Sequence, residues 1–280
     1  NKLEAFQVGI DALAKLTTGK VHLSVKGKGK SIFKDVKGVS LHQVYGPHPA
    51  GNVGVQIGKI SPINAGERVW TVTPQDVATI GELFLTGKFN ATRTVALVGS
   101  EVKDAQYYNV ISGASIADLV AGKIEGDNVR VISGDVLTGT KVKMDGNLGF
   151  LSNTVTVIPE GNVYRMFGWM PFASPSVHSA SRTGLSWLMP GKKYAPNTNL
   201  NGEERALVVT GEMEAVMPLD IFPMQLLKAC LASDIDKMES LGIYEVAPED
   251  FALIDYTNTS KLEAQQIIRE ALDLMIKEVG

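Results

Sequence analysis

The segment from Met217 to Lys261 constrains the fold most, because it holds several helix boundaries within a short length of chain. Ser233 and Asp236 mark the start of one helix, and Gly242 marks its end. Corners marked by Pro or Ser separate the helical segments. A run of short helices joined by tight turns is stable only as a packed group, so this segment predicts a helical domain.

The end of the chain predicts a longer amphipathic helix in the same C-terminal domain, which we place at residues 217–280. Ser260 and Glu263 have the spacing of a capping box at the start of that helix. Apolar residues then recur every three or four positions, while Arg269 and Glu270 fall on the solvent-facing side. The predicted buried stripe consists of Ala264, Ile268, Ala271 and Met275.

The cysteine content limits the chemistry of this helical domain. Its order of helices and turns is similar to that of an alpha-helical ferredoxin module, which carries iron–sulfur clusters. Each cluster generally needs four thiolate ligands, and the chain has 1 cysteine, Cys230. We therefore expect a domain that resembles an iron–sulfur module without clusters, with no metal ligands and no bound cofactor.

Charge and hydropathy disfavour several kinds of partner. The chain has 27 Lys and Arg against 30 Asp and Glu, so its net charge of -3 gives no basic surface for nucleic acid. No uninterrupted apolar run reaches the ~18 residues that cross a bilayer. Together with the single cysteine, which fits a reducing compartment, these features predict a cytosolic or peripheral protein.

Residues 1–90 mix helical and strand-like patterns. Apolar residues recur at helical spacing from Leu3 to Leu16, and Val21 to Val25 alternates like a strand. Val69 to Val72 has the pattern of a buried strand, and Thr73, which precedes a proline, is expected to cap the next helix. This order predicts a partial Rossmann-like α/β layer.

Residues 91–145 contain short strands around a single helix. The helix is expected from Ser115 to Val120 and is closed by Gly122. One helix among several strands is typical of a β-grasp module and does not fit a βαβ unit. The strands are expected at Val95–Val98, Tyr108–Ile111 and Val129–Ile132.

Residues 146–216 are rich in turn residues and aromatic side chains, which predicts a small β-rich connector before the helical domain. The aromatic group fits a core patch, a subunit interface or a small-molecule slot, and residue type leaves these three alternatives open. Its members are Phe150, Phe167, Trp169, Phe172 and Trp187.

The stretch from Leu41 to Ile60 holds the candidate contact residues. Its glycines and prolines fix turns and let the backbone approach a ligand closely. His48 stands between two prolines on a stiff segment, where its imidazole can face a ligand, a neighbouring subunit or water. The candidate residues for contact with a ligand or a subunit are Tyr45, His48, Pro49 and Gly51.

The chain resembles the A subunit of the sodium-translocating NADH:quinone oxidoreductase, the Nqr complex of bacterial membranes. Residues 92–142 are similar to the soluble-ligand-binding β-grasp (SLBB) module of this superfamily. The motifs that carry the resemblance follow one another in family order along nearly the whole chain. They are GPHPAGNVG (Gly46–Gly54), TPQDVATIGELFLTG (Thr73–Gly87), RVISGDVLTG (Arg130–Gly139), VMPLDIFP (Val216–Pro223) and SDIDKMESLGIYEVAPEDFAL (Ser233–Leu253).

The resemblance implies that the sequence is truncated at its N-terminal side, without a lipoyl-like segment and the first part of a Rossmann-like domain. In the related C subunit of the Rnf complex, the helical end binds two four-iron clusters. On that pattern Met217 and Pro218 stand at the first Cys-Pro, while Phe251, Ile254 and Asn258 occupy ligand positions of the second run. None of these side chains offers a thiolate.

The resemblance also implies a peripheral protein at the cytoplasmic face of the bacterial inner membrane, docked chiefly on the membrane subunits of the Nqr complex. It would take part in quinone reduction coupled to sodium export, with quinone as candidate substrate and with NADH and flavins handled by other subunits. The isolated chain is expected to be inactive and to have no catalytic residues. Two alternatives stay open: a purely structural docking subunit, and an Rnf-like or complex-I-like subunit that transfers electrons from NADH through flavin.

Overall fold

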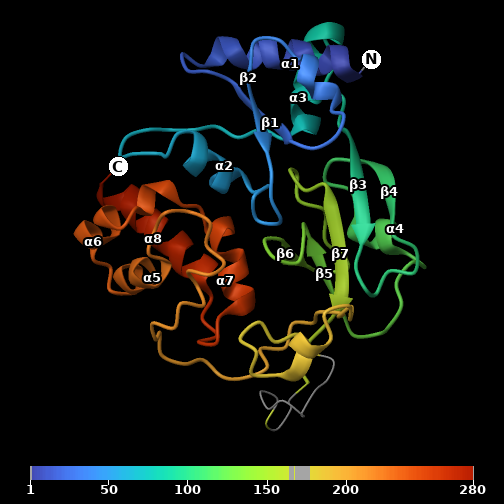
Figure 1. Ribbon diagram of the computed structural model, residues 1–280. Helices are drawn as coiled ribbons and strands as arrows, with labels where there is room; N and C mark the ends of the chain where they lie inside the picture. Colours follow the sequence, from blue (N-terminus) through green and yellow to red (C-terminus); the bar gives the residue numbers. More distant parts are fainter. Residues whose placement is uncertain (1, 164–166, 168–176, 280) are drawn as a thin grey trace. The chain divides into compact units, whose positions relative to one another are not determined.

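The structure is a computed structural model, shown in Figure 1, and it describes residues 2–163, 167 and 177–279. The chain divides into two compact units. The first comprises Asn1–Ala91 and Tyr244–Val246, and the second comprises Thr92–Ile243 and Ala247–Gly280. Helices and sheets are both present, which confirms the predicted mixed α/β class.

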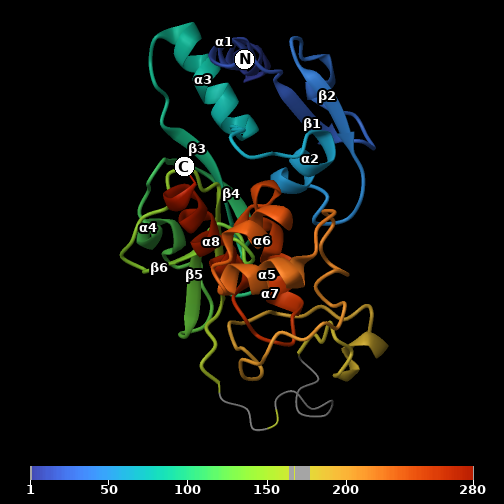
Figure 2. The same cartoon turned by 90° about the vertical axis from the view of Figure 1, so that its left-hand side faces the viewer.

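The first unit combines helices with a two-stranded sheet. Its elements are α1 (Lys2–Leu16), β1 (His22–Lys26), η1 (Ile32–Asp35), β2 (Ser40–Val44), α2 (Val53–Ile60) and α3 (Pro74–Thr86). Strands β1 and β2 are parallel, and His22 lies opposite Ser40 in their register. Helices α1 and α3 lie side by side, as Figures 1 and 2 both show. Helix α1 confirms the helix predicted from Leu3 to Leu16.

Helices α1 and α3 touch backbone to backbone. A Cβ atom added at Gly81 would lie 1.6 Å from the carbonyl oxygen of Ala5, and one added at Gly9 would lie 2.1 Å from the carbonyl oxygen of Val77. Only glycine leaves room for an approach this close. The buried cluster of this unit contains Phe6, Ile10 and Val77.

The start of α3 follows the sequence prediction, but the strand expected before it does not form. Thr73 caps α3, because its hydroxyl accepts a hydrogen bond from the backbone N–H of Asp76 at 3.3 Å, and Pro74 lies in the first turn. Residues 69–72 have no strand structure and the Trp70 side chain is 91% exposed, so the predicted buried strand is wrong. A short apolar run becomes a strand only where another strand pairs with it.

The first part of the second unit, up to Pro159, contains a five-stranded sheet and one short helix. Its elements are β3 (Thr92–Val98), β4 (Gln106–Ile111), α4 (Ile116–Val120), β5 (Val129–Ser133), β6 (Thr140–Val142) and β7 (Thr154–Pro159). The strand order is β4-β3-β7-β5-β6, with β3 and β7 parallel and all other neighbours antiparallel. Strand β7 comes from the stretch expected to be a connector, yet it lies at the centre of the sheet.

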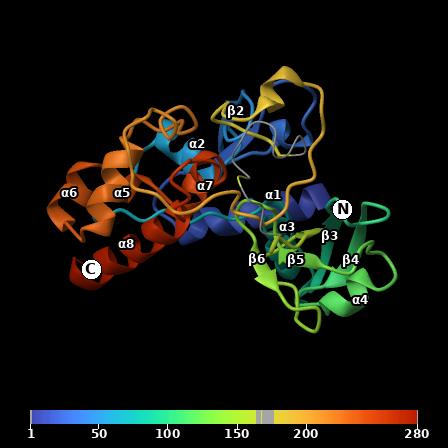
Figure 3. The same ribbon diagram turned by 90° about the horizontal axis from the view of Figure 1, so that it is seen from below.

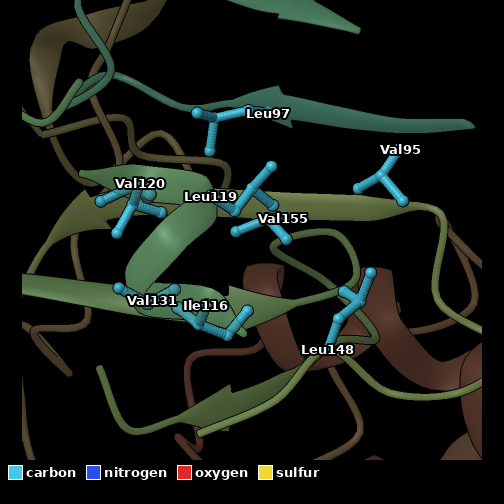
Figure 4. Close-up of a cluster of buried hydrophobic side chains, with 9 residues drawn as sticks. Val95, Leu97, Ile116, Leu119, Val120, Val131, Leu148 and Val155 are labelled. Carbon is cyan, nitrogen blue, oxygen red and sulfur yellow. The ribbon is translucent and has the colours of Figure 1, made fainter. Parts of the chain in front are cut away.

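Helix α4 packs its apolar residues onto this sheet (Figure 4). Ile116, Leu119 and Val120 of α4 are buried against strand residues that include Leu97 and Val155. Buried valine or leucine side chains stand two positions apart in β3 and in β7. One face of each strand therefore contributes to this core. The prediction of one helix among several strands is confirmed.

The rest of the predicted connector has little regular structure. Its one short element is η2 (Leu185–Leu188) within the described residues. Phe150 and Trp187 are exposed, so the core alternative is wrong for these two aromatic residues. Trp169 and Phe172 lie outside the described residues.

The chain ends in a group of helices, coloured orange to red in Figure 3, of which α8 is the longest. Helix α8 packs against α5, α7 and η4. Among the helices in the described part of the chain, none is both long and apolar enough to span a membrane. The elements are α5 (Pro223–Leu231), α6 (Ile235–Ser240), η3 (Ile243–Glu245), η4 (Pro248–Phe251), α7 (Ala252–Thr257) and α8 (Ala264–Glu278).

Helix α8 buries the predicted stripe but is not capped as predicted. Its buried residues are the four expected from the sequence. The capping box of Ser260 and Glu263 is wrong, because Glu263 is the N-cap residue and makes no side-chain capping bond. The carboxylate of Asp255 instead accepts hydrogen bonds from the backbone N–H groups of Ala264 and Gln265. A cap that comes from the preceding helix has no local sequence spacing to reveal it.

Candidate functional site

The predicted contact residues follow directly after β2 in the first unit. Tyr45 is 58% exposed, and its hydroxyl donates a hydrogen bond to Oε1 of Gln43 at 2.7 Å. A Cβ atom added at Gly27 would lie 2.1 Å from the Tyr45 ring, so this ring lies flat against the chain just beyond β1. Tyr45 therefore has a fixed position with one ring face covered.

The backbone between Tyr45 and α2 makes two successive turns. The N–H of Ala50 donates to the carbonyl of Pro47 at 2.9 Å, and the N–H of Asn52 donates to the carbonyl of Pro49 at 2.8 Å. His48 is exposed on the first turn. A Cβ atom added at Gly51 would meet nothing within 4 Å. The turns hold the four predicted residues in one segment, which we call the 45–51 loop; Tyr45, His48 and Gly51 are exposed and Pro49 is half-buried.

Two surface hollows lie elsewhere, and neither is lined by the 45–51 loop. One, of about 360 Å³, is lined by Ala14 of α1, Ser40 of β2 and residues of the segments that precede β1 and β2. The other, of about 220 Å³, lies between β4 and α4. There the Lys123 ammonium lies 4.2 Å from the centre of the Tyr108 ring and donates to the carbonyl of Leu119 at 2.7 Å. Its charge is therefore partly satisfied by a cation–π contact and a hydrogen bond.

A charged cluster around Glu160 joins β5, β6 and the segment near Thr198. Glu160 accepts two hydrogen bonds from Arg130, at 2.6 and 3.1 Å, and one from Lys141 at 2.9 Å. The Thr198 hydroxyl donates a further bond at 2.7 Å. The hydrogen bonds from Arg130 and Lys141 lower the pKa of Glu160 to about 2. Four hydrogen bonds from neighbouring side chains occupy the two oxygens of this carboxylate. Glu160 therefore holds these segments together and is not available as a catalytic base.

A small aromatic cluster surrounds His178 in the second unit. The Tyr256 hydroxyl forms a hydrogen bond with His178 Nδ1 at 3.1 Å, and the two rings are stacked with centroids 5.9 Å apart. The Tyr194 ring meets His178 edge-on at 5.5 Å. Burial, with a smaller contribution from Tyr194, raises the pKa of Tyr256. No local sequence pattern identifies this group, because Tyr256 lies 78 residues after His178.

Phe251, Ile254 and Asn258, which the resemblance aligns with iron-ligand positions, are packing side chains. Phe251 and Ile254 are 0% exposed, and Asn258 is 2% exposed. The Asn258 side chain donates to the carbonyl of Ile254 at 2.8 Å and accepts from the N–H of Leu262 at 3.3 Å. These residues hold α7 and the start of α8 together.

Among the described residues, the metal-ligating residue types His, Cys, Asp and Glu do not gather into a group of three or more that could hold a metal ion. Burial raises the pKa of the Cys230 thiol to about 11, which suppresses the thiolate that binds metals. The Asp250 carboxylate is buried, and its burial raises its pKa.

Comparisons with known proteins place the chain in one family. Residues 1–89 match the family model of the NqrA second alpha/beta domain, and residues 94–144 match an SLBB-type family model described as the NQRA C-terminal domain. The second match confirms the predicted SLBB-type module.

Curated relatives match over almost the whole chain. The chain is 37% identical over 276 residues to a protein of Neisseria meningitidis serogroup B, covering 98% of this chain and 62% of the relative. It is 39% identical over 279 residues to a protein of Serratia proteamaculans, covering 99% of this chain and 62% of the relative. It is 37% identical over 278 residues to a protein of Vibrio campbellii, covering 98% of this chain and 61% of the relative. All three are described as the A subunit of Na(+)-translocating NADH-quinone reductase, and the chain spans less than two thirds of their length.

Proposed function

The chain belongs to the NqrA family, the A subunits of Na(+)-translocating NADH-quinone reductase, and from this premise we propose that it works without a redox cofactor of its own. It docks on the membrane subunits of the Nqr complex at the cytoplasmic face. There it takes part in quinone reduction coupled to sodium export, while other subunits handle NADH and flavins.

The observation that carries this proposal is the packing of the helical domain. We propose that this domain keeps the layout of an iron–sulfur module while Phe251, Ile254 and Asn258 serve as core residues at the ligand positions. Four thiolates per cluster are needed, and the one cysteine, Cys230, is buried in α5. A domain without thiolate ligands for iron is suited to holding the subunits of a complex together and not to transferring electrons through clusters.

We assign the contact with quinone or with a neighbouring subunit to the 45–51 loop. Its support is geometric: an exposed imidazole, an exposed phenol and an open glycine lie on one segment held by its own turn hydrogen bonds. A loop that is ordered before binding loses less entropy on docking. Residues 1–90, which carry this loop, are proposed to be part of a Rossmann-like layer.

The proposal is tested on the assembled complex with and without this chain. Without it, NADH oxidation by an artificial electron acceptor should continue, because flavin and NADH sites lie on other subunits. Quinone reduction should be lost. Retention of both activities would contradict the proposal.

A second measurement tests the absence of clusters. The purified chain should be colourless and contain no stoichiometric iron or acid-labile sulfide. A brown preparation with bound iron would contradict the cofactor-free role. A yellow preparation with bound flavin would instead favour the electron-transfer alternative.

The purely structural alternative is favoured by one observation: neither hollow described above is lined by the 45–51 loop. Photo-crosslinking of the whole complex with a quinone analogue separates the two proposals. Label on the 45–51 loop supports a quinone contact. Label confined to other subunits leaves this chain with a docking role.

A further inference from the structure

Two of the four histidines of the chain meet on the exposed face of the β1–β2 sheet. Nδ1 of His22 lies 2.9 Å from Nε2 of His42, and the two rings are nearly parallel, at an angle of 17°. In the parallel register, His42 lies opposite Ser24, so the two histidines are diagonal neighbours on the same side of the sheet. None of the properties that follow from the family comparison involves this pair.

On β1, the opposite side faces the core of the first unit, whereas on β2 the residues of that side, Leu41 and Gln43, are exposed. Leu23 packs against the buried cluster and Val25 is itself buried. Side chains alternate along a strand, so His22 and Ser24 point away from that core. The facing nitrogens are therefore accessible to small solutes from the solvent side.

The distance between the ring nitrogens suits a metal chelate. Imidazole nitrogens bind first-row transition ions at about 2.0–2.1 Å, so two nitrogens in adjacent positions around one ion lie about 2.9 Å apart at a right angle and about 3.3 Å apart in a tetrahedron. The side-chain torsion that turns a histidine ring is broad. A small rotation of both rings can therefore direct their lone pairs at one ion without separating the strands.

The charge around the pair does not oppose a cation strongly. Lys26 is the charged residue of β1 and β2; it lies about 13 Å along the strand from His22 and, as a diagonal cross-strand neighbour, about 8 Å from His42, with its side chain exposed to water. At physiological ionic strength, charges separated by more than about 8 Å in water are largely screened. The remaining coordination positions are open to water.

We propose that His22 and His42 form a two-histidine site for a divalent transition ion of the Ni²⁺, Cu²⁺ and Zn²⁺ class. The ion takes the place of the hydrogen bond between the two nitrogens: the ring that donated this bond carries its proton on its other nitrogen instead, and the ion links β1 to β2. A two-stranded sheet is marginal by itself, so this link stabilises the first unit. The site is independent of the proposed role in quinone reduction.

The test uses Ni²⁺ as the probe and the full chain in a buffer that does not bind metals. Isothermal titration should give one equivalent of Ni²⁺ with a Kd in the micromolar range, because two protein nitrogens and water ligands bind moderately. The variants H22Q and H42Q should each weaken binding at least tenfold. The matched control is H48Q, which removes an exposed histidine of the same unit and should leave the affinity within twofold of the parent.

A second readout distinguishes the pair from scattered binding. Paramagnetic Ni²⁺ should broaden the imidazole NMR signals of His22 and His42 at substoichiometric amounts, before those of His48 and His178. Circular dichroism of H22Q and H42Q should match the parent, since both side chains lie on the polar face. Unchanged affinity in H22Q, or equal broadening of all four histidines, would overturn the proposal.

Discussion

The two compact units build a sheet and helix core in different ways. In the first unit, α1 and α3 supply a small buried cluster of Phe6, Ile10 and Val77, with Leu23 of β1 packed against it, and the two helices meet at glycines. In the second unit, five strands and α4 bury a larger cluster of valine, leucine and isoleucine. A small core thus depends on close backbone approach, whereas a large one depends on side-chain volume. Substitutions in each unit can test this difference.

The largest effect is expected from G81A in the first unit. Alanine would place its Cβ 1.6 Å from the Ala5 carbonyl oxygen and force α1 away from α3. We expect the first unit to lose about 3 kcal/mol or more of its free energy of unfolding. Hydrogen exchange should increase throughout residues 2–86 and stay unchanged in β3 to β7. Normal protection of α1 in this variant would show that the helices can separate without cost.

The next effect is expected from L97A in the second unit. Leu97 is 0% exposed in the middle of the sheet, so its truncation leaves a cavity. The loss should be about 2–5 kcal/mol in the free energy of unfolding, measured by denaturant titration. The control I111A changes a side chain that is 68% exposed on the edge strand β4. Equal losses in both variants would mean that the sheet does not depend on its buried face.

A moderate effect is expected from E160Q, which keeps the side-chain shape and removes the charge. The charge of Glu160 should contribute about 1–2 kcal/mol to the free energy of unfolding near neutral pH. This is less than the pKa shift alone implies, because Arg130 and Lys141 reach solvent. The folded state lowers the pKa of Glu160 from 4.5 to about 2. This stabilisation is therefore present above pH 4.5 and is lost as the pH falls towards 2.

The pH dependence provides the measurement for Glu160. The difference in unfolding free energy between the parent and E160Q should shrink as the pH is lowered from about 5 to about 2, and high salt should reduce it. A difference that stays constant with pH would assign the effect to packing and not to the ion pairs.

The smallest effect is expected from G51A in the 45–51 loop. A Cβ atom at Gly51 meets nothing within 4 Å, so the melting temperature should match that of the parent and the stability should change by less than about 0.5 kcal/mol. This variant is the matched control for G81A, since both add one methyl group to a glycine of the same unit. A large loss in G51A would show that the loop is packed against another part of the molecule.

Local sequence patterns predicted much of the fold. The periodic apolar residues of α1 and α8 and the threonine cap of α3 are encoded by neighbours three or four residues apart. The strand predicted at residues 69–72 failed because a strand needs a partner, which local sequence does not supply. Strand β7 was missed as part of the sheet because it returns to pair with β3 and β5 after a long separation.

The role of the 45–51 loop stays a prediction, and the contacts around the other candidate groups had no sequence signal. The sequence identified the 45–51 loop through its glycines and prolines, and the structure places those four residues on one segment. It gave no sign that Glu160 meets Arg130, a residue 30 positions earlier. It also gave no sign that Tyr256 meets His178.

By itself, the sequence determined which helix faces are apolar, where α3 starts and how few thiolates are available. These properties depend on residue type and on spacing within one or two turns. Only the tertiary structure decided which strand lies at the centre of the sheet, which side chain caps α8, and that His22 and His42 face each other. These contacts join residues far apart in the chain, and the register and packing of whole elements determine them.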